Sequence, residues 1–401
     1  MAAFSFLFYT HITLKIRFAI AVSILCLGYL ALEYYNGRAQ MADFRVYYDA
    51  ANALLKGDTV YGQAFGVSSG FYKYSPFACI PFIPLALLPY STASVLYFVL
   101  ITATIIFFSF RVSNYLSHRW NISAHTLIAP IVTGIFLIDH LERELHLGNV
   151  NLFLLVLLFE SYFALRSHMN YKAGILYGLV LLFKPHFVLI FPYLLWKRKI
   201  KAIASTIISV GIGILLPTIL VGWKTNEYLL AQWFTAMGDH NIALQYSPNT
   251  LYGLLNSLLP DAIAGKWMIA AVLSIVALAF VAFMIRNDAK DNTRWSGEIR
   301  YTEYFLLIAL VPNLVHTDTE HFLWTWPMLA LSIHHVIYRK DSSRKIRLIL
   351  LSLAFIPFAL NSPDLVGTRL QALFDEGGIG IANLLILAAS IWDVSNEKNI
   401  D

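Results

Sequence analysis

The 401-residue sequence is poor in charged residues. Asp, Glu, Lys and Arg make up only 13% of the chain, whereas a soluble domain carries about 25%. Hydrophobic residues make up 58%, and the mean hydropathy is +0.63. This balance excludes an ordinary soluble domain. It predicts an all-α polytopic membrane protein, because an α-helix makes all its backbone hydrogen bonds within itself, as the bilayer requires.

Cysteine is scarce too, and several motifs of defined chemistry are missing. The two cysteines, Cys26 and Cys79, lie in or near apolar runs, so neither a disulfide framework nor a Cys/His metal site is expected. We find no Gly-rich phosphate loop, no internal repeat and no low-complexity segment. The net charge of +5 would suggest nucleic acid in a soluble protein, but basic cytoplasmic loops explain it here. No nucleic acid partner and no cofactor are expected.

Apolar runs predict about twelve membrane-spanning segments in a single domain over residues 1–401. The runs at 173–183 and 186–196 are too short to cross alone, so we expect a broken helix pair that meets at Lys184-Pro185. Irregular backbone at membrane depth is tolerated where it faces protein or a water-filled cavity. The candidate spans are 16–34, 91–110, 122–139, 149–165, 173–183, 186–196, 202–222, 267–285, 301–315, 321–338, 346–361 and 379–393.

The first apolar run, at 16–34, has two interpretations. It follows Lys15 and Arg17, as the h-region of a signal peptide would. However, it is long for an h-region and lacks a convincing small-residue cleavage site. We therefore expect a retained helix.

The distribution of Lys and Arg predicts the orientation. With the N-terminus in the cytoplasm, the cytoplasmic segments hold 20 of the 29 Lys and Arg residues and the opposite side holds 9. The positive-inside rule then places both termini in the cytoplasm. The first outer loop (35–75), the stretch "DHLERELHLGNVN", the long outer loop (223–265) and "HTDTEH" all fall on the extracytoplasmic side. Trp223, Tyr228, Trp233 and Tyr246 suggest that the long loop lies on the membrane surface.

The stretch "DFRVYYDAANALLKG" has the spacing of a short amphipathic helix. An apolar stripe runs from Phe44 to Leu55, and Gly57 is a plausible C-terminal stop. Asp43 stands at the start of this helix, where a carboxylate can cap free N–H groups. On these residues alone, capping is favoured over a catalytic role for Asp43, and Asp49 falls on another face of the helix.

Two further stretches on the outer side are polar or irregular. Four prolines in "YKYSPFACIPFIPLALLPY" exclude a straight helix and predict an irregular apolar segment at the interface. In "DHLERELHLGNVNLFLL", His146, Asn149 and Asn151 stand where a span begins, and Gly148 allows a sharp turn. These three side chains form either helix caps or a polar binding edge.

Ionisable residues also stand at the start or in the middle of apolar runs. Lys184 has more than ten apolar residues on either side, and such a residue is costly and by default functional, although it can also snorkel. A lysine at a helix break suits an anionic phosphate. His316, Asp318, Glu320 and His321 fall within six residues, but this spacing is no standard metal pattern. We expect substrate recognition there and no metal.

The polar stretches resemble, in order and spacing, glycosyltransferase family 87, the polyprenyl-phosphate-mannose-dependent α-mannosyltransferases of bacterial membranes. The matching segments are "ADFRVYYDAANALLKGDTVY", "YKYSPFACIPFIPLALLP", "LGNVNLFLLVLL", "AGILYGLVLLFKPHFVLIFPYLLWKRK", "SPNTLYGLL" and "VPNLVHTDTEHFLWTWP". Of these, the Ala-Gly…Lys-Pro run is the most specific. The family histidine falls on His316 by spacing from Pro312 and on His321 by spacing to Pro327, so both stay open.

The resemblance implies a GT-C-type fold, with some broken helices and short outer-surface helices, and Asp43 as catalytic base. It implies an inverting transfer of a hexosyl residue from a polyprenyl-phosphate donor to a glycolipid or glycan acceptor, outside a bacterial inner membrane. Membrane lipids are further partners. A secondary transporter or a lipid-linked-sugar flippase is the alternative. Residues expected to bind donor or acceptor are Arg45, Tyr47, Lys73, Tyr74, His146, Asn149, Asn151, Lys184, Asn249, His316 and His321.

Overall fold

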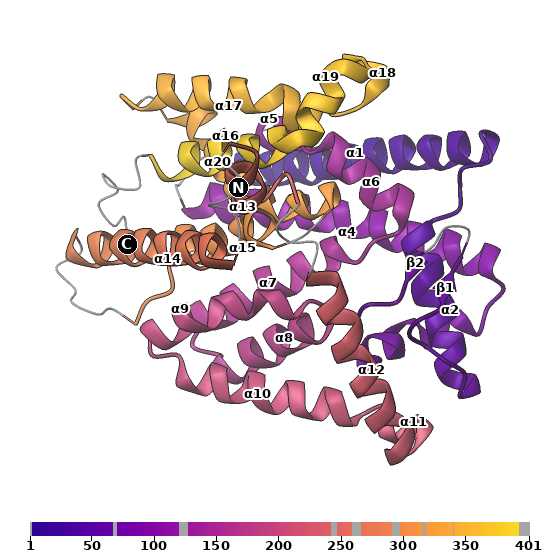
Figure 1. Cartoon of the computed structure of the whole chain (residues 1–401). Helices are drawn as coiled ribbons and strands as arrows, with labels where there is room; N and C mark the ends of the chain where they lie inside the picture. The colour runs from indigo at the N-terminus through magenta and orange to yellow at the C-terminus, as the bar shows by residue number, and fades with distance from the viewer. Residues whose placement is uncertain are drawn as a thin grey trace.

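The computed structural model describes eight stretches of the chain, and these are almost entirely helical (Figure 1). Within them, the only β-structure is an antiparallel ladder of β1 (Ala64–Phe65) with β2 (Gly70–Phe71). This confirms an all-α membrane protein at the level of fold class. The described stretches are 2–66, 70–119, 127–241, 247–258, 266–290, 297–315, 318–339 and 341–392.

The predicted count of about twelve spans is not confirmed. In the described part of the chain, five helical stretches are long and apolar enough to cross a membrane, or six if a bent pair counts as one span. That pair is α6 (Ile138–Leu147) and α7 (Asn151–Arg166), which meet at 116°. The five stretches are Thr13–Tyr35, Tyr90–Arg119, Ile200–Val221, Met268–Asp288 and Thr368–Ile391.

Several predicted spans fall on helices that are too short to cross the bilayer alone. The run 173–183 lies in α8 (Asn170–Phe183), which has 14 residues and is about 21 Å long at 1.5 Å per residue. A break at Lys184 follows, as predicted, before η2 (Pro185–Ile190) and α9 (Phe191–Trp196). The longer and the C-terminal helices are α1 (Ala2–Tyr35), α4 (Tyr90–Arg119), α10 (Ile200–Leu215), α14 (Lys266–Lys290), α15 (Tyr301–Leu314), α16 (Trp326–Tyr338), α17 (Arg344–Ala359) and α20 (Ile379–Ile391).

Shorter elements connect these helices. Helix α12 (Trp223–Asn241) occupies the long loop, with Trp223 exposed and Trp233 buried. The indole of Trp233 donates to the carbonyl oxygen of Lys73, so it is tied to the protein. The remaining short elements are α5 (Ile128–Phe136), α11 (Thr218–Val221), α13 (Leu251–Leu258), η4 (Thr319–Thr325), α18 (Pro363–Val366), α19 (Thr368–Leu373) and η5 (Phe374–Gly378).

The predicted amphipathic helix is α2 (Ala42–Lys56). Gly57 ends it in the left-handed conformation at φ 72°, as expected for a helix-stopping glycine. Its buried face includes Phe44, Tyr47 and Leu54, which pack against the next segment of the chain. The capping prediction for Asp43 is not supported, because Met41 occupies the N-cap position and Asp43 lies within the first turn.

The proline-rich segment is irregular, as predicted. It forms the 3-10 helix η1 (Pro76–Phe82) and the single-turn helix α3 (Ile83–Ala86). Both pack on α2, and Ser75 donates to the carbonyl oxygen of Leu182 at 2.5 Å. The segment therefore links α2 to the break after α8 instead of only anchoring the chain in lipid.

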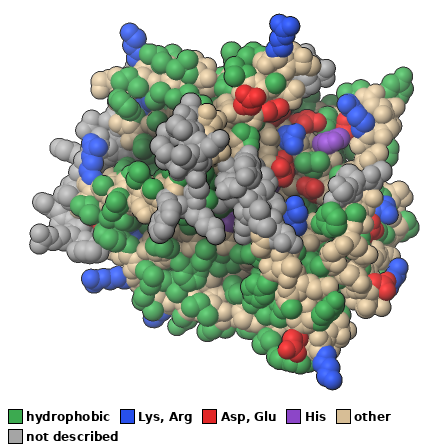
Figure 2. All heavy atoms as spheres, viewed as in Figure 1, with side chains coloured by type: hydrophobic (Ala, Val, Ile, Leu, Met, Phe, Trp, Pro, Cys, Tyr) green, Lys and Arg blue, Asp and Glu red, His purple; other side chains and the backbone are tan. Residues whose placement is uncertain are grey.

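Helix α2 and the β-ladder gather at one end of the helical bundle, on the right of Figure 1. The face shown in Figure 2 carries acidic, basic and histidine side chains close together at that end, with hydrophobic surface around them. The polar part of the molecule is therefore concentrated in one region.

Candidate active site

A cavity of about 510 Å³ opens at this end of the bundle. It lies where α2, the α6–α7 turn, the break after α8 and the start of η4 meet. Polar and apolar side chains share its wall, so it suits a ligand with a polar head and an apolar body. The lining residues are Asp43, Val46, Tyr47, Gly70, Phe71, Lys73, Tyr74, Asn149, Phe183, Lys184, Pro185, His186, Met237, Val315, Asp318, Glu320 and His321.

Asp43 enters the cavity wall from the first turn of α2. Its Oδ2 accepts a hydrogen bond of 2.6 Å from Nδ2 of Asn149. Burial raises the pKa of the Asp43 carboxyl above its usual value, and Lys184 opposes this rise. Asp318 raises that pKa further, whereas the hydrogen bond from Asn149 lowers it. The carboxyl is thus a more basic group than an exposed aspartate, as a proton acceptor should be.

The amide of Asn149 is held in one orientation. Its Oδ1 accepts the backbone N–H of Val150 at 2.7 Å, which turns Nδ2 toward Asp43. The hydroxyl of Tyr97 donates to the Asn149 backbone carbonyl at 3.3 Å. Gly148, just before it, has φ 67°, a conformation that glycine adopts without strain.

Lys184 stands at the helix break and is 4% exposed. Its ammonium group contacts Nε2 of His321, whose Nδ1 lies 3.2 Å from the carbonyl oxygen of Asp318. These contacts fit a neutral imidazole that donates from Nδ1 and accepts from Lys184 at Nε2. The ammonium also lies 5.8 Å from the ring centroid of Tyr74 and 5.2 Å from that of Trp324. A buried lysine in such surroundings is a candidate for binding an anion.

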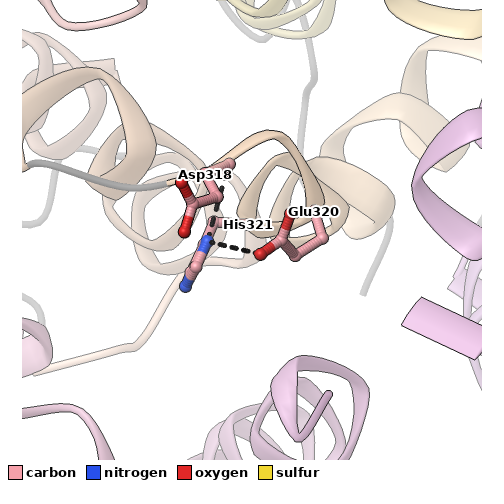
Figure 3. A group of neighbouring side chains, drawn as sticks. All are labelled: Asp318, Glu320 and His321. Atoms are coloured by element: carbon pink, nitrogen blue, oxygen red, sulfur yellow. Dashed lines mark hydrogen bonds and ion pairs between the residues drawn. The ribbon is translucent and has the colours of Figure 1, made fainter. Parts of the chain in front are cut away.

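Two carboxylates stand beside the histidine (Figure 3). The side chains of Asp318, Glu320 and His321 offer atoms within 4.8 Å of one another, a spacing that could hold a cation. However, Arg143 donates to Glu320 at 3.3 Å, and both nitrogens of His321 have a neighbouring group. Burial raises the pKa of the Glu320 carboxyl to about 7, Asp318 adds to this rise, and Arg143 opposes it.

Two tyrosines complete the polar wall. The hydroxyls of Tyr47 and Tyr74 lie 3.1 Å apart, and that of Tyr47 donates to Oδ1 of Asn149 at 3.5 Å. Burial raises the pKa of both phenols well above the ordinary value, and Asp43 adds to the rise. Both groups therefore stay protonated and can donate or accept hydrogen bonds to a hydroxyl-rich ligand.

Seven of the predicted site residues line the cavity: Asp43, Tyr47, Lys73, Tyr74, Asn149, Lys184 and His321. They come from segments that lie up to 278 positions apart in the numbering, between 43 and 321. His316 lies outside the described residues.

Four other predicted site residues lie elsewhere. Arg45 pairs with Asp49 at 2.7 Å and stacks on Tyr90, so it does not pair with Asp43. His146 pairs with Glu33 at 2.6 Å. Asn151 donates to Glu144. Asn249, just before α13, accepts the backbone N–H of Gly380 in α20.

Three acidic groups near the cavity were not predicted as site residues. Asp318 and Glu320 line it, and Glu144 lies buried behind the α6–α7 turn. Asp318 and Glu320 belong to the polar stretch for which the sequence predicted substrate recognition, but only the two histidines of that stretch were predicted as binding residues. Glu144 stood in "DHLERELHLGNVN", where only its complete burial beside a bend distinguishes it from the half-buried acids Asp139 and Glu142.

The fold and the cavity together define a class. This is an integral membrane protein in which a hydrogen-bonded carboxylate and a buried lysine line one cavity, a pair that can accept a proton and bind an anion. The model of glycosyltransferase family 87 matches residues 71–310. The chain belongs to glycosyltransferase family 87, so the predicted family and enzyme class are confirmed.

Curated relatives agree with this membership. A polyprenol-phosphate-mannose-dependent alpha-(1-2)-phosphatidylinositol pentamannoside mannosyltransferase of Mycobacterium tuberculosis is 24% identical over 73% of this chain. The match covers 66% of that protein, just under two thirds of its length. The protein of the same name from Mycolicibacterium smegmatis is 24% identical over 75% of this chain and 70% of its own.

A third relative carries a different sugar in its name. An alpha-(1->3)-arabinofuranosyltransferase of Corynebacterium glutamicum is 26% identical over 45% of this chain and 42% of its own. No solved structure matches the fold.

Proposed function

We propose that the protein transfers a hexosyl residue, most simply mannosyl, from a polyprenyl-phosphate donor to a hydroxyl of a glycolipid or glycan acceptor. The observation that carries this proposal is that Asp43 and Lys184 line the same cavity, where the positive charge of Lys184 acts on the Asp43 carboxyl. Two relatives are named for a polyprenol-phosphate-mannose donor and a phosphatidylinositol mannoside acceptor. The third relative's name keeps a pentosyl donor open.

Asp43 is the general base in this proposal. As the acceptor oxygen attacks C1 of the donor sugar, its proton passes to the Asp43 carboxylate. The bond between C1 and the phosphate oxygen breaks, and its electron pair leaves with the polyprenyl phosphate. Because attack and departure occur on opposite faces, one displacement inverts C1 and turns a β-linked donor into an α-linked product.

Lys184 binds the donor phosphate and stabilises it as it leaves. The ammonium has N–H donors in addition to the one directed at His321. Since Lys184 lines the cavity, these donors can reach a ligand there. Lys73 lies on the same wall and adds positive charge. Since phosphate is a good leaving group once its charge is stabilised, no strong general acid is needed.

The reaction takes place on the extracytoplasmic side in this proposal. Every cavity-lining segment belongs to a stretch that the Lys and Arg count assigns to that side, or to its edge. Polyprenyl-linked sugars are used where sugar nucleotides are absent, so the side and the donor are consistent. The GT-C-type fold remains a prediction in the same sense.

The test is transfer of radiolabelled mannose from polyprenyl-phosphate-mannose by purified protein in detergent, with no membrane gradient. Asp43→Asn should fold normally but lose about two or more orders of magnitude in rate, the usual size of a base effect. Asp49→Asn is the matched control, because Asp49 lies on the same helix but pairs with Arg45. Near-normal transfer by Asp43→Asn would show that Asp43 is not the base. A wild-type protein that transfers no sugar from any polyprenyl phosphate would refute the proposed function.

A further inference from the structure

Glu144 is a buried acid that does not line the cavity. It lies near the end of α6 and is 0% exposed. Its Oε1 accepts the backbone N–H of Leu152 at 2.7 Å, and its Oε2 accepts Nδ2 of Asn151 at 3.2 Å. One carboxyl group therefore accepts a backbone N–H that has no partner within α7 and a side-chain amide N–H at the start of that helix.

The backbone of Glu144 holds the same turn from the other side. Its carbonyl oxygen accepts the N–H groups of Gly148 and Asn149, at 3.1 and 3.2 Å. Side chain and backbone of one residue thus make four hydrogen bonds across the 116° bend between α6 and α7. The turn between these bonds carries Asn149, whose amide donates to Asp43.

The turn also packs closely against the start of α2. A Cβ atom on Gly148 would lie 2.7 Å from Cβ of Phe44 and 2.8 Å from Cε of Met41. Those two residues flank Asp43 closely in the sequence. A displacement of the turn therefore changes the contact between Asn149 and Asp43, because close-packed groups have no room to absorb it.

We propose that Glu144 is a positioning residue that fixes the α6–α7 turn so that the Asn149 amide donates to the Asp43 carboxylate. Glu144 touches neither substrate nor reacting atoms and acts through Asn149. This inference rests on the proposed role of Asp43 as the base. It requires hydrogen-bond acceptors at position 144 rather than a negative charge.

Two substitutions separate acceptance from charge. Glu144→Leu removes both acceptors, and kcat should fall on the order of 100-fold, as for a misplaced catalytic group, with little change in KM. Glu144→Gln should keep most of the activity. Its Oε1 can still accept from Leu152. Once the Asn151 side chain rotates, the new amide of Gln can donate to Oδ1 of Asn151, an atom that has no hydrogen-bond partner among the described residues. Glu142→Leu is the control on the same helix, since Glu142 accepts from Tyr29.

The pH profile of kcat gives a readout that a merely structural role would not move. Lys184, Lys73 and Asp318 also act on the Asp43 carboxyl and stay in place. Loss of the Asn149 hydrogen bond in Glu144→Leu should move the acidic limb to higher pH, because that bond lowers the pKa of Asp43. In an Asn149→Ala background, Glu144→Leu should cost almost nothing more.

Three results would overturn the proposal. These are full activity of Glu144→Leu, an equal loss in Glu144→Gln, which would assign a role to the charge, or additive losses with Asn149→Ala. If Glu144→Leu does not fold, Asn151→Ala takes its place. Asn151→Ala removes one of the two hydrogen bonds of the Glu144 side chain. It also removes the Oδ1 atom to which the amide in Glu144→Gln would donate, so the double variant should be severely impaired. Retained activity of that double variant would equally reject the proposal.

A readout without the reaction separates this inference from the proposed function. An experimental structure of Glu144→Leu should show Nδ2 of Asn149 withdrawn from Oδ2 of Asp43 beyond hydrogen-bond distance, whereas Glu142→Leu should keep that contact. An unchanged contact in Glu144→Leu rejects the positioning role even if the enzyme is active. Failure of the wild type to transfer sugar would instead reject the proposed function.

Discussion

Asp43 combines burial with nearby positive charge, and the balance between them determines its ionisation. Burial raises the pKa of its carboxyl, whereas Lys184, Lys73 and the Asn149 amide lower it. Arg45, the cation next to it in the sequence, is instead bound to Asp49. The groups that regulate Asp43 are therefore distant in the sequence, and their arrangement is a property of the folded cavity.

The pH dependence of kcat should report this balance. A base works only when ionised, so kcat should be level above the raised pKa and fall about tenfold per pH unit below it. Its midpoint should lie above the value of about 3.9 for an exposed aspartate. Lys73→Met should shift the acidic limb to higher pH, because it removes a cation that lowers this pKa.

Lys56→Met is the control for that experiment, since Lys56 is exposed at the far end of α2. A profile in which Lys73→Met and Lys56→Met behave alike would show that Lys73 does not act on the base. A wild-type midpoint at or below that of an exposed aspartate would contradict the raised pKa itself.

Asp318, Glu320 and His321 have the spacing of a cation site, yet their contacts favour a metal-independent enzyme. Lys184 occupies one nitrogen of His321, the Asp318 carbonyl lies against the other, and Arg143 binds Glu320. A metal ion would have to displace Lys184 or break these contacts. Transfer should therefore persist in excess EDTA, measured with the same radiolabel assay. Loss of activity with EDTA, restored by Mn²⁺ or Mg²⁺, would establish a metal site at these residues.

At the scale of single elements, the α6–α7 turn has no room for an added methyl group at Gly148. Gly148 and Gly57 both end a helix with positive φ, at 67° and 72°. An alanine in this conformation costs about 1–2 kcal/mol at either position. Only at Gly148 would the new Cβ meet other atoms, those of Phe44 and Met41, whereas Gly57 faces open space.

Gly57→Ala should therefore lower stability slightly and leave kcat near the wild-type value. Gly148→Ala should lower stability further and reduce kcat strongly, because it moves Asn149 relative to Asp43. Thermal unfolding in detergent and the transfer assay measure the two effects. Equal kcat values for the two variants would show that the turn does not set the geometry of the base.

Local sequence patterns predicted those elements whose limits depend on nearby residues. The amphipathic spacing after Asp43, the stop at Gly57 and the break at Lys184 are all of this kind. The direction of a side chain after a sharp bend cannot be predicted from such a local pattern. His146 and Asn151 flank the bend, and its 116° angle directs them to Glu33 and Glu144 instead of the cavity.

At the scale of the whole molecule, the hydropathy pattern identified apolar runs but did not predict how many of them cross the membrane. A run of 11 to 16 residues can form a helix that packs against its neighbours without crossing a bilayer of about 30 Å. Helices α8, α15 and α16, with 14, 14 and 13 residues, are examples. The class of fold could thus be predicted from composition, whereas the number of spans depends on how short helices combine.

The side of the membrane that carries the cavity can be tested by labelling single cysteines. The two native cysteines, Cys26 and Cys79, are free and buried, so the unmodified chain should give a low background with an impermeant maleimide. Lys56→Cys, at the cavity end, should be labelled in intact spheroplasts, whereas Lys201→Cys, in the first turn of α10, should react only after permeabilisation. This follows from the excess of Lys and Arg assigned to the cytoplasmic side. The reverse pattern would place the cavity in the cytoplasm, where sugar nucleotides are available, and would remove the main reason for a polyprenyl-phosphate donor.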